Sequence, residues 1–307
     1  MKKRFRAIIA ILTILSVLST FSTSNVFAAG RTLSLSQTYI SPTQWADYSE
    51  YAINAVPDTI DMLVGETPVF AGEQNSGGYY YAYSDFTKNH SEAFGNIKLP
   101  TGFNNENRRN AFIAFGITPP DKQGIDAGIK NEGNGWWPCI LDTKAHTFTE
   151  WPEYKAPSTA TNAKIVFKPI NNTTVGLYIQ WLNSSGNPVY SQGQTGPFDM
   201  NISISERPGL VDTSGASGFN CRFYRFASLV PKTGDGSGDN RNDGSYMTGG
   251  MFLNLGLYNK TRNAYDNWGI YTSQISVAWR THPENCSVTS ITTTSEAFTI
   301  RHNNHIS

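Results

Sequence analysis

Short runs of alternating apolar and polar residues, bounded by turn-forming residues, constrain the fold of this 307-residue chain more than any other feature. A period of two is typical of β-strands with one buried face. The clearest runs align Val175, Leu177, Ile179 and Trp181; Ile275, Val277 and Trp279; and Met251, Leu253, Leu255 and Leu257. Further runs cover residues 111–117, 164–168, 201–205, 222–226 and 296–301. Many strands joined by Gly, Asn, Asp and Pro turns predict an all-β sandwich or barrel.

Helix signals are scarce and gather in residues 41–55. Ser41 could cap a helix there, Pro42 suits its first position, and Gln44 completes a capping-box pattern. We therefore expect at most one or two short helices. Because no fixed-period repeat and no Pro/Ser-rich linker divides the chain, residues 29–307 are expected to form a single jelly-roll β-sandwich domain of the concanavalin-like kind.

The first residues are typical of a secretory signal peptide. A basic segment, MKKRFR, precedes the apolar run AIIAILTILSVL and the small-residue pattern Val26-Phe27-Ala28. The apolar run is too short to span a bilayer comfortably, and no second long apolar stretch follows. We expect residues 1–28 to be removed and the protein to be secreted without a membrane span.

The charge balance argues against a nucleic-acid partner. Residues 1–28 contain four basic side chains and no acidic one, so in the remaining chain the 24 acidic residues exceed the basic ones by four. Nucleic-acid-binding proteins carry basic clusters, and only the pair Arg108-Arg109 remains. We expect a monomer with no nucleic-acid partner.

The three cysteines, Cys139, Cys221 and Cys286, are far apart and lack CxxC spacing. This spacing disfavours a zinc site and a disulfide-dense scaffold. Two alternatives stay open: one disulfide with one free thiol, or three reduced cysteines buried as small apolar residues.

Residues 133–154 concentrate three tryptophans and a tyrosine. A strand at 125–130, a turn at 131–135 and a strand from Trp136 predict a hairpin. Successive strand residues point to opposite faces, so one of Trp136 and Trp137 is expected to enter the core while the other faces outward.

Trp151 and Tyr154 follow in TEWPEYKAP, where Pro152 and Pro157 favour a loop or an edge over a central strand. Exposed aromatic rings can stack on the apolar faces of sugars, while carboxylates bind sugar hydroxyls. The candidate carbohydrate-binding residues are Trp136, Trp137, Trp151, Tyr154, Asp126, Glu150 and Glu153. The alternative is that these aromatic residues only cover one end of the sandwich.

Glycoside hydrolysis would need a pair of carboxylates flanking the scissile bond. Asp126, Glu132, Glu150 and Glu153 are the nearest candidates, but the E-x-D-x-E strand of laminarinase-like hydrolases is absent. We therefore keep catalysis as an alternative to binding.

The run at residues 251–258 resembles the last strand motif of jelly-roll alginate lyases. Phe252, Asn254, Gly256 and Tyr258 occupy loosely corresponding places, and the resemblance implies an acid/base role for Tyr258. The motif lysine is missing, and no Q-[IV]-H segment lies upstream. The resemblance therefore supports the fold more than the reaction.

Residues 234–245 gather acidic side chains on a glycine-rich backbone. Asp235, Asp239 and Asp243 supply oxygen ligands suited to Ca²⁺, although the spacing fits no EF-hand. The alternative is a polar surface loop without a metal.

Segments within residues 110–230, among them FIAFGI, GWWPCI and EWPEY, resemble the YrpD-like family of uncharacterised secreted proteins of Gram-positive bacteria. That resemblance implies a secreted, β-rich protein and transfers no functional residue. The sequence thus favours a lectin-like protein that binds a polysaccharide or cell-surface glycan. A polysaccharide lyase or glycoside hydrolase on the same fold, or a secreted toxin or surface interaction protein, remains the alternative.

Overall fold

A computed structural model describes residues 25–26, 32–33, 78–84, 90–104, 109–211, 219–231, 244–269, 274–280 and 286–301. The chain divides into two units, Met1–Ile40 and Ser41–Ser307. In the first unit, β1 (Asn25–Val26) pairs with β2 (Thr32–Leu33) in antiparallel register. Most of the expected signal peptide, the expected helix at 41–55 and the candidate calcium ligands Asp235, Asp239 and Asp243 lie outside the described residues.

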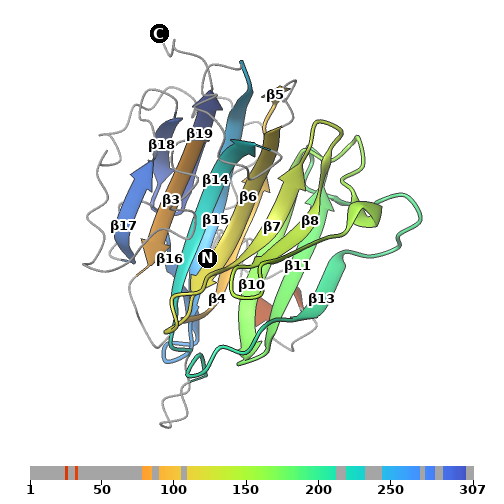
Figure 1. The fold of residues 1–307 in the computed structure, drawn as a ribbon. Helices are drawn as coiled ribbons and strands as arrows, with labels where there is room; N and C mark the ends of the chain where they lie inside the picture. The colour runs from red at the N-terminus through yellow and green to blue at the C-terminus, as the bar shows by residue number, and fades with distance from the viewer. Residues whose placement is uncertain are drawn as a thin grey trace, which may run out of the picture. The chain divides into compact units, whose positions relative to one another are not determined.

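The second unit contains two antiparallel sheets (Figure 1). The seven-stranded sheet has the order β17 (Ile275–Arg280), β3 (Gly78–Ser84), β14 (Arg222–Pro231), β6 (Arg109–Thr118), β7 (Ile125–Asn131), β8 (Trp136–Asp142) and β9 (Thr147–Glu150). Its edge strand β9 leads into a 3-10 turn, η2 (Pro152–Tyr154). The predicted hairpin of β7 and β8 is confirmed. The segment around Pro152 was predicted to be a loop or a sheet edge, and β9, which precedes it, is the edge strand of this sheet.

The ten-stranded sheet has the order β12 (Pro188–Val189), β11 (Thr174–Leu182), β10 (Asn162–Asn171), β4 (His90–Lys98), β15 (Tyr246–Asn259), β19 (Ser295–Arg301) and β18 (Cys286–Thr292). Three further strands complete it: β13 (Phe198–Ser203) beside β11, and β16 (Ala264–Asn267) and β5 (Gly102–Asn104) beside β15. The described part of the second unit contains no α-helix, so the all-β prediction is confirmed. Within the described residues, no helix is long and apolar enough to cross a membrane.

Side chains of both sheets meet in one hydrophobic core, which makes the unit a β-sandwich. Phe115 of β6 lies 6.4 Å from Phe252 of β15 and 5.9 Å from Trp268, measured between ring centroids. A fully buried ion pair also joins the sheets, with Arg225 Nε of β14 2.7 Å from Glu296 Oε1 of β19. The strand pattern of the sequence therefore predicted the sandwich, including the buried face Val175, Leu177, Ile179 and Trp181 of β11.

One predicted strand face is wrong. The alternation predicted that Met251, Leu253, Leu255 and Leu257 share a face of β15, but the core contains Phe252, Leu255 and Leu257. The register of β15 against β4 shifts between Leu253 and Gly256, and Asn254 between them has a φ of 54°. This β-bulge adds one residue to β15 and moves the side chains before it to the opposite face.

The three cysteines are all buried and free. Of the two alternatives left by the sequence, the structure therefore has the reduced cysteines. Burial raises the pKa of the Cys139 and Cys221 thiols far above the ordinary value, so both remain protonated.

Candidate functional site

The two adjacent tryptophans of β8 face opposite sides of the seven-stranded sheet, as predicted. Trp136 belongs to the core and lies 6.1 Å from the Phe103 ring. Trp137 lies on the outward face, where its Nε1 donates a hydrogen bond of 3.1 Å to Glu150 Oε2. Both tryptophans are 5% exposed, so neither presents an open ring as a platform for a ligand.

Trp151 and Tyr154 directly follow the edge strand β9 and pack against the hydrophobic core. Their rings pack against Phe198 of β13 at centroid distances of 4.9 Å and 5.2 Å. The Tyr154 carbonyl accepts a hydrogen bond of 2.9 Å from Trp181 Nε1. Both side chains are half-buried, whereas Glu153 between them is exposed. Their role in carbohydrate binding stays a prediction, and their packing on Phe198 leaves only part of each ring exposed.

A charged cluster forms on the outward face of β7, β8 and β9 because the strand register aligns residues far apart in sequence. Lys130 pairs with Trp137, and Cys139 pairs with Glu150. Lys130 Nζ lies 2.5 Å from Glu132 Oε1 and 2.9 Å from Glu150 Oε2. Burial alone would lower the pKa of Lys130, but its hydrogen bonds and charge interactions with the two glutamates raise the pKa above its ordinary value.

Glu150 is the most open carboxylate of this cluster, with a side chain 37% exposed. Its hydrogen bonds from Lys130 and Trp137 both go to Oε2. Among the described residues, Oε1 receives no hydrogen bond. The carboxylate is therefore held in one orientation while one oxygen stays available to a ligand.

Phe148 precedes Glu150 by two residues on β9, so both side chains lie on the same outward face. It is 41% exposed and is one of three exposed large hydrophobic residues in the described part of the chain, with Ile170 and Tyr190. The Phe112 ring contacts it edge-on at 6.0 Å, and Lys130 Nζ lies 4.7 Å from its centroid. We call Lys130, Trp137, Phe148 and Glu150 the β9 edge site.

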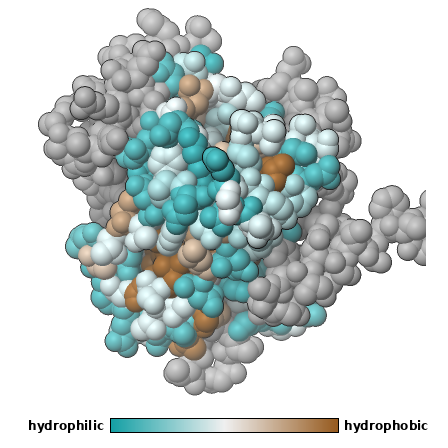
Figure 2. Space-filling view, turned by 90° about the vertical axis from the view of Figure 1, so that its right-hand side faces the viewer, coloured by the Kyte–Doolittle hydropathy of each residue, from teal (hydrophilic) through white to brown (hydrophobic). Residues whose placement is uncertain are grey.

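The side of the second unit that carries β8, β11 and β13 in Figure 1 is mostly hydrophilic, with a few small hydrophobic spots (Figure 2). Isolated apolar residues are normal on a protein surface. An exposed aromatic ring is a candidate ligand contact only where fixed polar groups lie beside it, as they do at Phe148.

Asp126 lies on the same outward face, closer to the middle of the sheet. It pairs with Leu141 in the ladder, and its Oδ1 accepts a hydrogen bond from the Tyr224 hydroxyl. The Tyr224 ring covers Gly116, where any Cβ atom would overlap the ring. Asp126 is 5% exposed, so the structure separates this candidate from the open carboxylate of Glu150.

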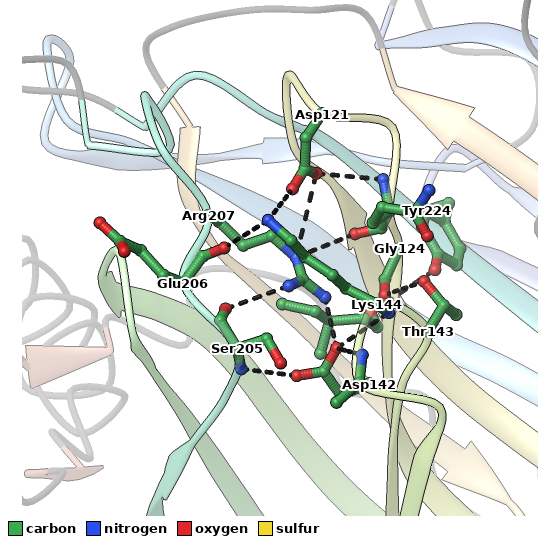
Figure 3. Close-up of polar contacts among 12 residues, drawn as sticks. Asp121, Gly124, Asp142, Thr143, Lys144, Ser205, Glu206, Arg207 and Tyr224 are labelled. Atoms are coloured by element: carbon green, nitrogen blue, oxygen red, sulfur yellow. Dashed lines mark hydrogen bonds and ion pairs between the residues drawn. The ribbon is translucent and has the colours of Figure 1, made fainter.

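A second polar cluster joins three loops beyond the far end of β8 (Figure 3). Arg207 is fully buried, and its guanidinium donates to Asp142 Oδ1 at 2.5 Å, to the Ser205 carbonyl at 3.0 Å and to the Gln123 carbonyl at 3.1 Å. Asp142 also accepts hydrogen bonds from the backbone N–H groups of Lys144, Ala145 and Ser205. We call this group the Arg207 latch.

The hydrogen bonds of the latch outweigh the effect of burial on the pKa of Asp142. Burial alone would raise the pKa of its carboxyl group, but the bonds from Ser205, Arg207 and Ala145 lower the pKa below its ordinary value. The carboxylate is thus ionised and fully engaged within the protein, which is typical of a structural ion pair.

No group of His, Cys, Asp and Glu side chains suited to a metal ion occurs in the described residues. The calcium prediction concerns residues outside them and stays a prediction.

Of the four residues of the β9 edge site, the sequence analysis named Trp137 and Glu150 as candidates but not Lys130 and Phe148. The alternation in TFTE, residues 147–150, was the available signal, because it puts Phe148 and Glu150 on one face. Lys130 could not be assigned from sequence, since its contact with Glu150 depends on β8 lying between β7 and β9.

Comparisons with known proteins find only distant likenesses among solved structures. No family model matches the sequence and no curated protein matches it significantly, so the YrpD-like resemblance gains no support. Among solved structures, scytalido-glutamic peptidase with a peptide-based transition-state analogue has a TM-score of 0.44 at 8% identity, covering 73% of this chain and 97% of that one. A Bacillus licheniformis β-glucanase has a TM-score of 0.21 at 10% identity, covering 49% and 70% of the two chains. An alginate lyase with alginate tetrasaccharide has a TM-score of 0.21 at 13% identity, covering 52% and 71%. At these values no activity and no site residue is transferred to this chain.

Proposed function

We propose that this chain is an exported carbohydrate-binding protein and that it recognises a polysaccharide or cell-surface glycan at the β9 edge site. One observation carries the proposal: an exposed aromatic ring, Phe148, lies beside a carboxylate, Glu150, that two hydrogen bonds hold in place.

The two residues supply the two kinds of contact that a sugar needs. The apolar C–H face of a sugar ring can pack against Phe148, and burial of that surface is favourable. A sugar hydroxyl can donate to Glu150 Oε1. Because Lys130 and Trp137 already fix the carboxylate, little side-chain entropy is lost when the ligand binds.

The residues around Phe148 and Glu150 have different roles, which depend on their positions relative to β9. Trp137 and Lys130 act as positioning residues for Glu150, since both are buried and both donate to its Oε2. Trp151, Tyr154 and Glu153 follow β9 directly and would contact a glycan that extends past the edge strand.

The test is affinity electrophoresis of the mature chain through gels that contain plant, algal or bacterial glycans. For the glycan that retards the wild type, Phe148→Ala should weaken binding about tenfold, the effect of losing on the order of 1.4 kcal/mol of contact. Glu150→Gln should weaken it by a similar factor. Tyr190→Ala is the matched control, because Tyr190 is 42% exposed and lies outside the site.

Two results would overturn the proposal. One is that no glycan retards the wild type, which would favour a surface interaction protein instead. The other is that Tyr190→Ala weakens binding as much as Phe148→Ala. A separate incubation of the chain with the same glycans distinguishes binding from catalysis. New reducing ends would indicate a hydrolase, and the absorbance of unsaturated uronates would indicate a lyase.

Export is tested independently of the glycan. The basic segment, apolar run and Val26-Phe27-Ala28 pattern predict a mature N-terminus within two residues of Ala29. Intact-mass measurement of the culture supernatant should find that species. A product that begins at Met1 and stays with the membrane would contradict export.

A further inference from the structure

The charges at the β9 edge site do not balance. Lys130 Nζ lies 2.5 Å from Glu132 Oε1 and 2.9 Å from Glu150 Oε2, so a single ammonium group pairs with two carboxylates. The Lys130 side chain is only 6% exposed, whereas the side chains of Glu132 and Glu150 are 23% and 37% exposed. The charge that this group presents to solvent is therefore negative.

A third carboxylate strengthens the negative field on this face. The ladder pairs Cys139 of β8 with Gly128 on one side and with Glu150 on the other, so Cys139 lies at the centre of the face. Burial is the main cause of the raised pKa of its thiol; among the nearby charges, Lys130 lowers that pKa, while Glu150 and Asp126 raise it. The carboxylates that act on this face thus outnumber its ammonium group.

The lysines that follow β8 and β9 in the chain do not cancel this excess. Lys144 Nζ donates to Asp121 Oδ2 at 3.0 Å and to the Glu206 carbonyl at 2.8 Å, within the loops beyond the other end of β8. Lys155 extends over Gly135 in the turn between β7 and β8. The exposed Glu153, two residues before Lys155, carries the opposite charge.

The open part of this field coincides with the exposed aromatic ring. Glu150 accepts its two hydrogen bonds, from Lys130 and Trp137, at Oε2, and no described residue donates to Oε1. Phe148 is 41% exposed and lies two residues earlier on the same face of β9. A ligand at this place meets an apolar surface and a negatively charged acceptor together.

A protonated amine matches these two features better than any other group that a sugar carries. A hydroxyl group offers the Glu150 carboxylate only a dipole, whereas an ammonium group offers a full positive charge, and the attraction between opposite charges is stronger where water is partly excluded. A uronate or a sulfate would add another negative charge to the site and would be repelled. Acetylation of the amine would remove the positive charge and leave only a neutral amide.

We propose that the β9 edge site recognises a cationic glycan, in which a hexosamine unit with a free amino group donates from its ammonium group to Glu150 Oε1 while its ring packs on Phe148. The inference rests on the proposed function and narrows it to one class of sugar. Charge complementarity contributes to specificity more than to total affinity. The site should therefore distinguish sugars of the same ring shape by the charge of their substituents.

The test compares two ligands that differ only in acetylation, the hexamers of glucosamine and of N-acetylglucosamine. Isothermal titration calorimetry of the mature chain at about pH 6 measures both affinities. We expect the glucosamine hexamer to bind at least about tenfold more tightly. Glu150→Gln keeps the shape of the site and should bring the two affinities close together, whereas Phe148→Ala should weaken both by a similar factor and preserve their ratio.

Matched controls separate this site from general charge attraction. Asp199→Asn removes an exposed carboxylate on β13, in the other sheet, and should leave the ratio of the two affinities unchanged. If Asp199→Asn reduces the ratio as much as Glu150→Gln does, the preference is a property of the whole surface and the inference is overturned. A lysine hexapeptide should bind more weakly than the glucosamine hexamer. Equal affinity, with the same dependence on Phe148, would identify a site for basic peptides and would also overturn the inference.

Failure of this inference and failure of the proposed function give different results. If the N-acetylglucosamine hexamer, or a neutral or anionic glycan of the electrophoresis panel, binds at least as tightly as the glucosamine hexamer and depends on Phe148, the preference for a free amine is wrong and the proposed function stands. If neither hexamer and no glycan of the panel binds, both are wrong.

Discussion

Two polar clusters lie at opposite ends of β8 and differ in how much of their bonding capacity the protein itself uses. At the far end, the Arg207 latch is sealed: the Arg207 side chain is 0% exposed and Asp142 6% exposed. At the near end, the β9 edge site is open, because the Glu150 side chain is 37% exposed although its partner Lys130 is only 6% exposed.

This difference in exposure indicates which of the two charged clusters can bind a ligand. In the latch, Asp142 accepts from Arg207 and from three backbone N–H groups, so neither of its oxygens is available. In the edge site, the hydrogen bonds of Glu150 converge on one oxygen. A sealed cluster fixes the loops around it, whereas a half-open one combines a fixed geometry with a free acceptor.

The largest expected effect comes from opening the latch. Asp142→Ala removes the one carboxylate that is hydrogen-bonded to the buried Arg207 guanidinium among the described residues, and such a loss costs about 3–5 kcal/mol of the free energy of unfolding. Urea denaturation of the purified chain measures it. The control is Asp121→Ala, because Asp121 is 23% exposed and lies 3.9 Å from Arg207 Nε; its expected cost is below about 1 kcal/mol. A small effect in Asp142→Ala would mean that the latch is not sealed.

A smaller effect is expected from the edge site. Lys130→Met keeps an apolar side chain against Phe148 but removes the charge between Glu132 and Glu150. Solvent screens the two partly exposed carboxylates, so the expected cost is about 1–2 kcal/mol. The same denaturation experiment decides, and the distinction between the two clusters fails if Lys130→Met is as costly as Asp142→Ala. Glycan affinity should fall in this variant because Glu150 loses one of its two donors.

The smallest effects are opposite pH dependences of the two clusters. The folded-state pKa of Asp142 lies below its ordinary 3.8, so its stabilisation is present above about pH 4 and is lost as the pH falls through the folded-state value. The folded-state pKa of Lys130 lies above its ordinary 10.5, so its stabilisation is complete below 10.5 and is lost as the pH rises further. In melting curves recorded against pH, Asp142→Asn should flatten the acid arm and Lys130→Met the alkaline arm. A variant that flattens the wrong arm would refute the assignment.

The strands could be predicted because their signal is local. Alternation in residues 174–181 and 111–117 identifies β11 and β6, and the Gly-rich turn at 131–135 identifies the hairpin of β7 and β8. Asn131 shows the local chemistry of that turn, since its side chain accepts a hydrogen bond of 2.6 Å from the Gly133 N–H. The opposite orientation of Trp136 and Trp137 follows from the strand period alone.

Alternation failed where a contact across the sheet overrode it. The bulge at Asn254 exchanges the faces of β15, and nothing in MFLNLGLY distinguishes a regular strand from a bulged one. For the same reason, the sequence did not predict how deeply each aromatic side chain is buried. Trp151 and Tyr154 pack on Phe198, which is more than forty residues away in sequence.

The sequence by itself determined the β-sandwich class, most strand positions and the two faces of β8, because these depend on the period of side chains along one strand. Only the tertiary structure decided which charged residues meet. Lys130 reaches Glu150 across an intervening strand, and Arg207 reaches Asp142 from a distant loop. Such contacts depend on strand order and register, and burial then decides whether a carboxylate is sealed within the protein, as in Asp142, or left with a free oxygen, as in Glu150.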